Sequence, residues 1–310
     1  MRAFVLRRLL QAIPTLLGVI LLTFILFQVV GGNPVYRLLG KNASPTEVTR
    51  LTHQLGLDQA LPIRFIQYVG NVFQFDFGRS WETRQRISEM LWDGLWPSLS
   101  LAIPAFIIGI LLAIVIALLA AAWRRKKIDR ILVTLSVLGM SISILAFIIG
   151  AQYLLAYHWN VFPISGWEAG WQGLPYLALP ILLWVISQLG SDVRFYRAVF
   201  IEEYGREHVR AAEARGLGFG RILIWHVLRN GCGPIITQLS MGLPTLFTGS
   251  LLLENFFGIP GLGNLGVNAI NASDLPVIQA LTVVGALLYM TGNLIGDLLY
   301  ALADSRVKVG

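Results

Sequence analysis

The sequence predicts an all-α integral membrane protein that crosses the membrane several times, and three observations carry this prediction. Of the 310 residues, 55% are hydrophobic and only 13% are charged, whereas about 25% are charged in an average soluble domain. The apolar residues come in long runs without Asp, Glu, Lys or Arg, and many of the basic residues lie in short segments between these runs. Soluble proteins rarely expose that much contiguous apolar surface, so we expect the surplus to face lipid.

Six charge-free runs are long enough to span the hydrocarbon core, which a helix crosses with about 20 apolar residues. They are 9–36, 94–123, 131–167, 169–191, 230–253 and 275–296. The first run follows Arg2, Arg7 and Arg8, as in a signal peptide, but its apolar part, 9–30, exceeds the usual 7 to 15 residues. We therefore expect a retained first helix. The third run is longer than one crossing and is expected to leave the bilayer near Tyr157.

A seventh charge-free stretch, 255–273, is rich in Gly and Asn and contains Pro260. Its backbone polar groups would lack partners in lipid, so it is predicted to be a surface or re-entrant loop after the fifth span. Within it, Gly261–Gly266 has the form GxGxxG of dinucleotide sites, but no predicted strand precedes it. We expect these glycines to serve tight turns.

The placement of Lys and Arg predicts the orientation, because cytoplasmic segments carry the excess of basic residues. Four alternate segments are basic: the N-terminal tail, 124–130, 194–229 and the C-terminal tail. The segments 158–173 and 255–275 contain neither Lys nor Arg. We therefore expect both termini in the cytoplasm and 31–96 outside. The chain, 1–310, is expected to form one transmembrane domain with its core helices in 94–303.

The outer segment is predicted to be folded. Ser44-Pro45-Thr46-Glu47 has the capping-box pattern, so a helix should begin there and end near Gly56. A second helix is expected over 62–75, where apolar residues recur at helical spacing, and Gly78 should end it. Two interpretations stay open, a packed external cap and a docking surface for an external partner.

The segment 200–229 is too polar to span the membrane and is rich in helix formers. We expect one cytoplasmic helix over 202–215, supported by ion pairs of Glu203 with Arg206 and of Glu207 with Arg210. Its apolar face consists of the small residues Val209, Ala212 and Gly216, and Gly216 suits a helix C-terminus. A helix lying on the membrane would carry large apolar residues on that face. The small residues favour close packing against another protein.

The spacing Ala211-Ala212-x-x-x-Gly216, in a polar segment before the penultimate apolar run, resembles the EAA loop of permease subunits of ABC importers. Further segments resemble the dipeptide and oligopeptide branch of that family. They are Val209–Leu217, His226–Asn230, Glu254–Gly263, Leu55–Asp58 with Phe77–Ser80, and Asp297–Arg306. Arg210 and Arg229 depart from the general EAA pattern as that branch does, whereas Asp304-Ser305-Arg306 differs from the branch's usual Asp-Pro-Arg.

The resemblance implies a permease subunit in the bacterial inner membrane that works with several partners. These are a second homologous permease, two cytoplasmic ATPases that bind ATP and Mg, and an external substrate-binding protein. The cargo would be a peptide, or glutathione or a nickel chelate as in other members of the branch. The resemblance also implies that the polar helix docks on an ATPase. The implied docking residues are Glu207, Val209, Arg210, Ala211, Ala212, Glu213, Arg215, Gly216 and Leu217.

Motifs for other functions are absent from the sequence. There is no GxxxxGK[ST] phosphate-binding loop, no HExxH and no GxSxG motif, and Cys232 is the single cysteine. We therefore expect no enzyme activity and no cofactor or metal in this chain, and no nucleic-acid binding. A secondary transporter, the main alternative, should show inverted repeats and mid-membrane ionisable residues. Outside the charge-free runs, Asp297 is the only ionisable residue expected within a spanning helix, and we find no inverted repeat, which disfavours a secondary transporter.

A polar stripe on the fifth run marks candidate residues for a translocation path. Gln238, Met241, Thr245 and Thr248 fall on one face of a helix. The same residues could instead bond to neighbouring helices. Asn293 and Asp297 share a face near the inner end of the sixth run, where the acid could simply pair with an arginine.

Overall fold

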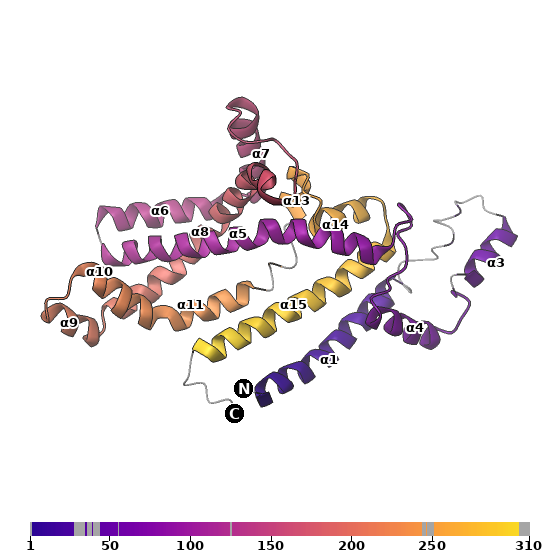
Figure 1. The fold of residues 1–310 in the computed structure, drawn as a ribbon, viewed down its shortest axis with the longest axis horizontal. Coiled ribbons are helices and arrows are strands. Elements are labelled where there is room, and N and C mark those ends of the chain that lie inside the picture. The colour runs from indigo at the N-terminus through magenta and orange to yellow at the C-terminus, as the bar shows by residue number, and fades with distance from the viewer. Residues whose placement is uncertain are drawn as a thin grey trace.

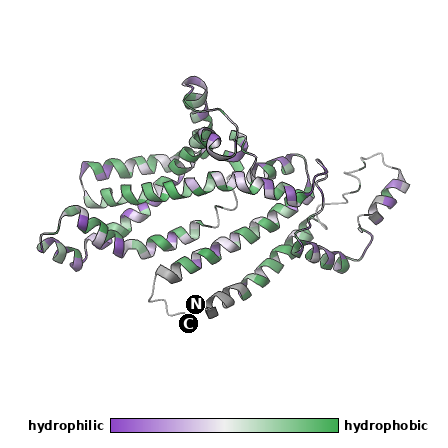
Figure 2. Cartoon of the chain, in the orientation of Figure 1, coloured by the Kyte–Doolittle hydropathy of each residue, from purple (hydrophilic) through white to green (hydrophobic). Residues whose placement is uncertain are grey.

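The computed structural model describes residues 2–27, 35, 39, 44–54, 56–124, 126–243, 246 and 251–303. Within these ranges the secondary structure is helical, and the one isolated β-bridge joins Arg79 and Arg86. The long helices form an elongated bundle, with α9 (Glu207–Ala214) at one end and α3 (Pro45–Gln54) at the other (Figure 1). Hydrophobic residues dominate the long helices, whereas α9 and α3 are more hydrophilic (Figure 2). The prediction of an all-α protein is confirmed for the described residues.

In the described part of the chain, three single helices are long and apolar enough to cross a membrane: α5 (Ile87–Ala122), α8 (Leu174–Tyr204) and α15 (Leu275–Ala303). Helix α5 packs against α8, and α15 packs against both α1 (Arg2–Ile25) and α11 (Arg229–Gly242). Helix α11 continues without a break from α10 (Phe219–Ile222) through a π-helical segment, η4 (Leu223–Leu228). Helices therefore lie where the first, second, fourth, fifth and sixth apolar runs predict them.

The third apolar run forms two helical parts rather than one continuous helix. It forms α6 (Lys127–Ser141) and α7 (Ile144–Ala151), which continues as the π-helical η2 (Gln152–His158), and the two parts are bent by 93°. Ile142 and Ser143 are extended between them. Ser141 turns its hydroxyl back to the Val137 carbonyl at 2.9 Å, a bond that competes with helix continuation. The helix ends at His158, next to Tyr157, and the exit from the bilayer near Tyr157 stays a prediction.

Helix α8 is longer than the apolar run that predicts it, because it continues beyond residue 191 to Tyr204. The helix therefore carries Asp192, Arg194 and Arg197, so the expectation that Asp297 is the only ionisable residue within a spanning helix is wrong. Arg197 donates two hydrogen bonds to Asp129 at the start of α6, at 2.6 and 2.7 Å. This bidentate pair satisfies the charge on one face of α8 and fixes α6 against it.

The outer segment follows its local signals. At the start of α3, the Glu47 amide donates to the Ser44 hydroxyl, and the Ser44 amide donates to the Glu47 carboxylate, both at 3.3 Å, which confirms the capping box. Helix α4 (Leu61–Phe73) begins and ends slightly earlier than predicted, and Gly78 follows with φ of +75°. Phe65 of α4 contacts Phe24 of α1, with ring centroids 5.3 Å apart.

The stretch 255–273 contains more helix than the predicted loop. Helix α13 (Leu251–Phe257) and α14 (Leu262–Asn271) are joined by a tight turn at 258–261. The reason is a carboxylate: Glu254, fully buried, accepts hydrogen bonds from the amides of Gly263 and Asn264 at 2.7 and 3.2 Å. It also accepts one from Ser98 of α5 at 2.9 Å. A Cβ on Gly261 would overlap this carboxylate and the Ser98 hydroxyl, the two side-chain groups that hold the turn.

Candidate functional site

The polar segment after α8 forms a separate short helix, α9. The sequence predicts one helix over 202–215, but α8 ends at Tyr204 and α9 begins at Glu207. At its other end, Gly216 has φ of +75°, and the amides of Gly216 and Leu217 donate to the carbonyls of Glu213 and Ala212. These are the two bonds of a Schellman motif. The predicted role of Gly216 at a helix C-terminus is confirmed.

The small-residue face of α9 packs inside its own chain. Val209 is fully buried and Ala212 is 4% exposed. They belong to one hydrophobic cluster with Phe200 of α8, Val227 of η4 and residues of α5. The expectation that this face seats in a partner is therefore wrong for Val209 and Ala212. Small residues do indicate close packing, but the surface they pack against belongs to the chain itself.

The opposite face of α9 is exposed and strongly polar. Its exposed residues are Glu207, Arg210, Ala211, Glu213, Ala214, Arg215 and Gly216, and Leu217 is half-buried. Just beyond it, Phe219 is 48% exposed between Gly218 and Gly220. Phe219 is the first residue of α10, directly after Gly218, and it was not among the predicted docking residues. Aromatic residues and arginines are enriched at protein–protein interfaces, and this face combines Phe219 with the exposed Arg210 and Arg215.

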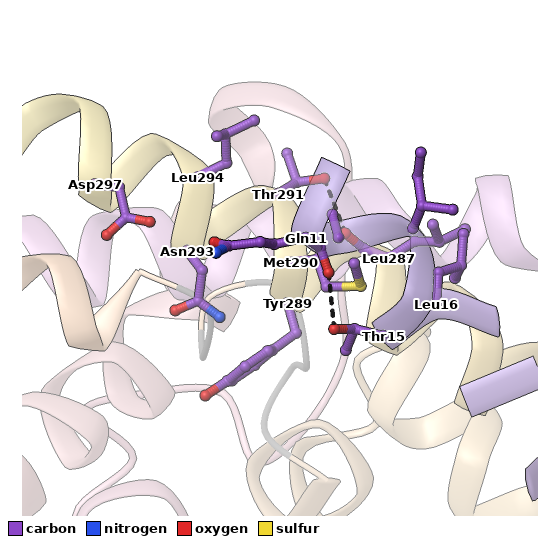
Figure 3. Close-up of a pocket in the computed structure, with 12 residues that line it drawn as sticks. Gln11, Thr15, Leu16, Leu287, Tyr289, Met290, Thr291, Asn293, Leu294 and Asp297 are labelled. Carbon is purple, nitrogen blue, oxygen red and sulfur yellow. Dashed lines mark hydrogen bonds between the residues drawn. The ribbon is translucent and has the colours of Figure 1, made fainter. Parts of the chain in front are cut away.

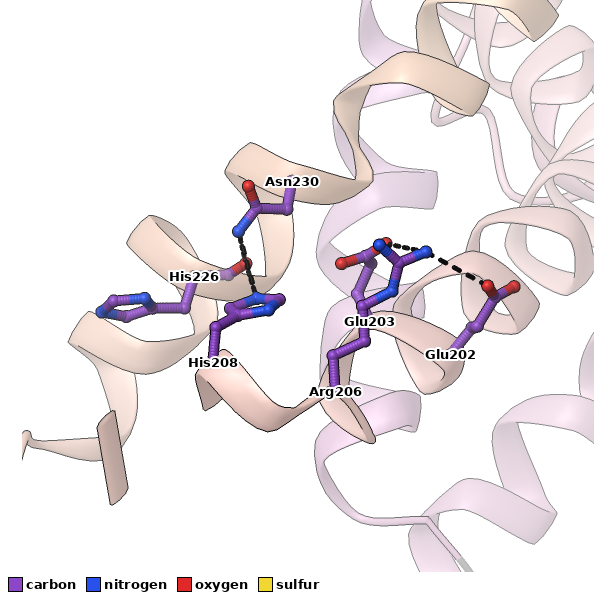
Figure 4. A network of polar contacts seen from close by, with 6 residues as sticks. All are labelled: Glu202, Glu203, Arg206, His208, His226 and Asn230. Atoms are coloured by element: carbon purple, nitrogen blue, oxygen red, sulfur yellow. Dashed lines mark hydrogen bonds and ion pairs between the residues drawn. The ribbon is translucent and has the colours of Figure 1, made fainter. Parts of the chain in front are cut away.

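Polar contacts connect α9 to its neighbours on both sides (Figure 4). Arg206 pairs with the buried Glu203 at 3.0 Å and with Glu202 at 3.2 Å, which confirms the predicted pair of Glu203 with Arg206. Glu207 and Arg210, both exposed, form no ion pair, so that prediction is wrong. On the other side, the Asn230 amide of α11 lies 3.1 Å from His208 Nε2. Tyr204 of α8 also donates to Glu213 at 3.1 Å.

A cavity of about 260 Å³ lies between α5, α8 and α11. Gln238 and Met241, two of the predicted path residues, line it from α11, and Gln188, Ser191 and Asp192 line it from α8. Thr245 and Thr248 lie outside the described residues. None of these α8 residues was predicted to line a path: Gln188 and Ser191 lie within the fourth charge-free run, and Asp192 directly follows it, where the predicted span ends. Helix formers continue past that position, and they were the available signal.

A second cavity, of about 520 Å³, lies between α1 and α15 (Figure 3). Asn293 and Asp297 line it from α15, on one face as the sequence predicts, and Gln11 and Thr15 line it from α1. The Thr15 hydroxyl donates to the Gln11 carbonyl at 3.1 Å. In the described part of the chain, no three His, Cys, Asp or Glu side chains are grouped as a metal site.

Comparison with known sequences decides the family. Residues 109–309 match the family described as "Binding-protein-dependent transport system inner membrane component", and residues 1–102 match its N-terminal region. The chain belongs to this family. It is therefore the permease component of an ABC importer and a multi-pass inner-membrane protein, and ATP hydrolysis belongs to a separate subunit.

Several relatives of this permease match it over nearly its whole length. A protein of Brucella abortus, named as a peptide transport system permease, is 34% identical over 99% of each chain. The glutathione transport system permease GsiC of Salmonella choleraesuis is 33% identical over 98% of each chain. A chain of the MetNI methionine ABC transporter, in an inward facing conformation, has a TM-score of 0.52 at 17% identity. It covers 68% of this permease and 96% of that chain, and the likeness shows a shared fold.

Proposed function

We propose that this permease imports peptides and forms half of the translocation path. A second homologous permease would form the other half. Two cytoplasmic ATPases would supply the energy, and an external binding protein would deliver the cargo. The names of the full-length relatives support a peptide cargo. Glutathione, itself a small peptide, is the second candidate, because one of these relatives is a glutathione permease. A nickel chelate is a further alternative within the branch.

The proposed topology has six spans. They are α1, α5, the bent pair of α6 with α7 and η2, α8, the continuous helix 219–242, and α15. The start of α6, which carries the basic residues Lys127 and Arg130, and the polar α9 share one end of the bundle, and α1 begins and α15 ends toward that end (Figure 1). Because basic segments favour the cytoplasmic side, we assign this end and both termini to the cytoplasm.

The observation that carries the proposed mechanism is that α9 packs in one hydrophobic cluster with two of the helices that line a cavity. Helices α8 and α11 both line the 260 Å³ cavity, and α9 shares a buried cluster with both through Val209 and Ala212. Packed interiors move as units because they tolerate little change of volume. A displacement of α9 by an ATPase would therefore shift α8 and α11 together and reshape the cavity.

Within this mechanism, two groups of residues have different roles. The exposed face of α9 would contact the ATPase, through Glu207, Arg210, Ala211, Glu213, Arg215, Gly216 and Leu217, with Phe219 added by the structure. The buried Val209 and Ala212 would transmit the motion to the helix bundle. Gln238 and Met241 would line the path, and helical spacing adds Thr245 and Thr248 to the same proposal.

Isolation of the intact complex tests the proposal. The chain should be purified in mild detergent with an affinity tag, and the proteins that accompany it should be identified. We expect two ATPase subunits and one homologous permease. After reconstitution with the binding protein, ATP-dependent uptake of a labelled tripeptide should be competed by unlabelled tripeptide and only weakly by glutathione. Strong competition by glutathione alone would replace the peptide assignment with glutathione.

A further inference from the structure

Asp192 is a carboxylate in the wall of the cavity between α5, α8 and α11. Among the described residues it forms no hydrogen bond and no ion pair. The neutral polar side chains of Gln188, Ser191 and Gln238 line the same cavity. Gln188 and Ser191 are exposed, so this wall is open on one side. An acid in a spanning helix is a functional candidate, since such residues normally have a charged or polar partner.

The arginines of α8 do not supply that partner. A helix turns about 100° per residue, so Arg194 and Arg197 lie about 160° and 140° around the helix from Asp192. Arg197 is already engaged by both oxygens of Asp129 on α6. The negative charge of Asp192 therefore faces a space lined by uncharged groups.

The position of Asp192 along α8 places the charge near the cytoplasmic side of the span, as the proposed topology assigns it. It lies 18 residues after Leu174, where α8 begins, which corresponds to about 27 Å at 1.5 Å per residue. The hydrocarbon core is about 30 Å thick. With the cytoplasmic end assigned above, cargo would pass Asp192 shortly before it leaves the membrane.

We propose that Asp192 binds the ammonium group of the cargo and so favours cargo with a free amino terminus. The carboxylate would form a charge-assisted hydrogen bond with the ammonium, and the amide groups of Gln188 and Gln238 would replace part of its hydration. This inference rests on the proposed import of peptides. The part of the proposal that Asp192 makes the cavity a site for a cation does not depend on which cargo is transported.

A cysteine probe tests the cation site without any transport. In the purified complex, with Cys232 replaced by alanine, Gln238→Cys is treated with a cationic thiosulfonate that bears an ammonium and with an anionic one that bears a sulfonate. After correction for their rates with a free thiol, we expect the cationic reagent to react about tenfold faster, because opposite charges attract across the cavity. Asp192→Asn should remove this preference, and Asp192→Glu should keep it.

Two controls make the probe specific. At Asn271→Cys, on α14, the ratio of the cationic to the anionic reaction rate should be the same with and without Asp192→Asn. Ser191→Ala, which removes a neighbouring polar group without a charge, should leave the ratio at Gln238→Cys unchanged. A ratio near one at Gln238→Cys, or a preference that persists in Asp192→Asn, would overturn the cation site.

Uptake measurements then test the cargo. The complex with its binding protein is supplied with trialanine and with its analogue that lacks the amino group. Asp192→Asn should reduce the uptake of trialanine at least about tenfold more than it reduces the uptake of the analogue. This difference is the loss expected for one hydrogen bond to a charge. Equal losses for both cargos would assign Asp192 a structural role and overturn cargo recognition. If neither peptide is transported, the proposed peptide import has failed, while the cysteine probe still reports on the site.

Discussion

The two faces of α9 lead to opposite expectations for the same substitution at adjacent positions. Ala211 is exposed, whereas Ala212 is 4% exposed and packs in the cluster with Phe200 and Val227. Ala211→Trp should change the stability of the permease by less than about 0.5 kcal/mol, as for most surface changes. It should nevertheless release the ATPases or prevent uptake, because an indole would occupy the docking face.

Ala212→Trp should act on the permease itself. A side chain of that size has no space in a filled core, and overpacking typically costs about 1 to 3 kcal/mol, which should lower the abundance and the thermal stability of the chain. Both variants are compared with wild type by thermal unfolding of the detergent-solubilised chain, ATPase retention and uptake. Full uptake with retained ATPases in Ala211→Trp would refute the docking face. Unchanged thermal stability in Ala212→Trp would refute the packing of α9.

Three further predictions concern topology, activity and the α13–α14 turn. With Cys232 removed, Asn271→Cys should react with an impermeant thiol reagent in intact cells and Glu213→Cys should not, whereas the reverse pattern would invert the orientation. The purified chain alone should hydrolyse no ATP, and sustained hydrolysis by a contaminant-free preparation would contradict its assignment as a permease. In Glu254→Ala, the amides of Gly263 and Asn264 lose their acceptor. One buried group left without its hydrogen bond costs about 1 to 3 kcal/mol, so the substitution should destabilise the chain by that amount or more. Thermal unfolding would measure this loss, and an unchanged midpoint would argue against the buried carboxylate.

Features that depend on neighbouring residues could be predicted from the sequence. The capping box at Ser44 and Glu47 closes within one turn of helix, and Gly216 adopts its left-handed conformation to end α9. The long apolar runs predict where most of the helices lie, because an apolar surface of that length is stable only in lipid or in a core. The permease family was likewise recognisable from short motifs of adjacent residues.

Features that depend on contacts between distant segments required the tertiary structure. The sequence determined that α9 has a small-residue face, but only the fold decided that Val209 and Ala212 pack on α8 and η4 rather than on a partner. Likewise, the charge of Asp192 ended an apolar run, and only the packing of α8 against α5 and α11 placed that charge in a cavity. Helical periodicity states which residues share a face. Which surface covers that face depends on segments far away in the chain, and their positions are set by the packing of the whole bundle.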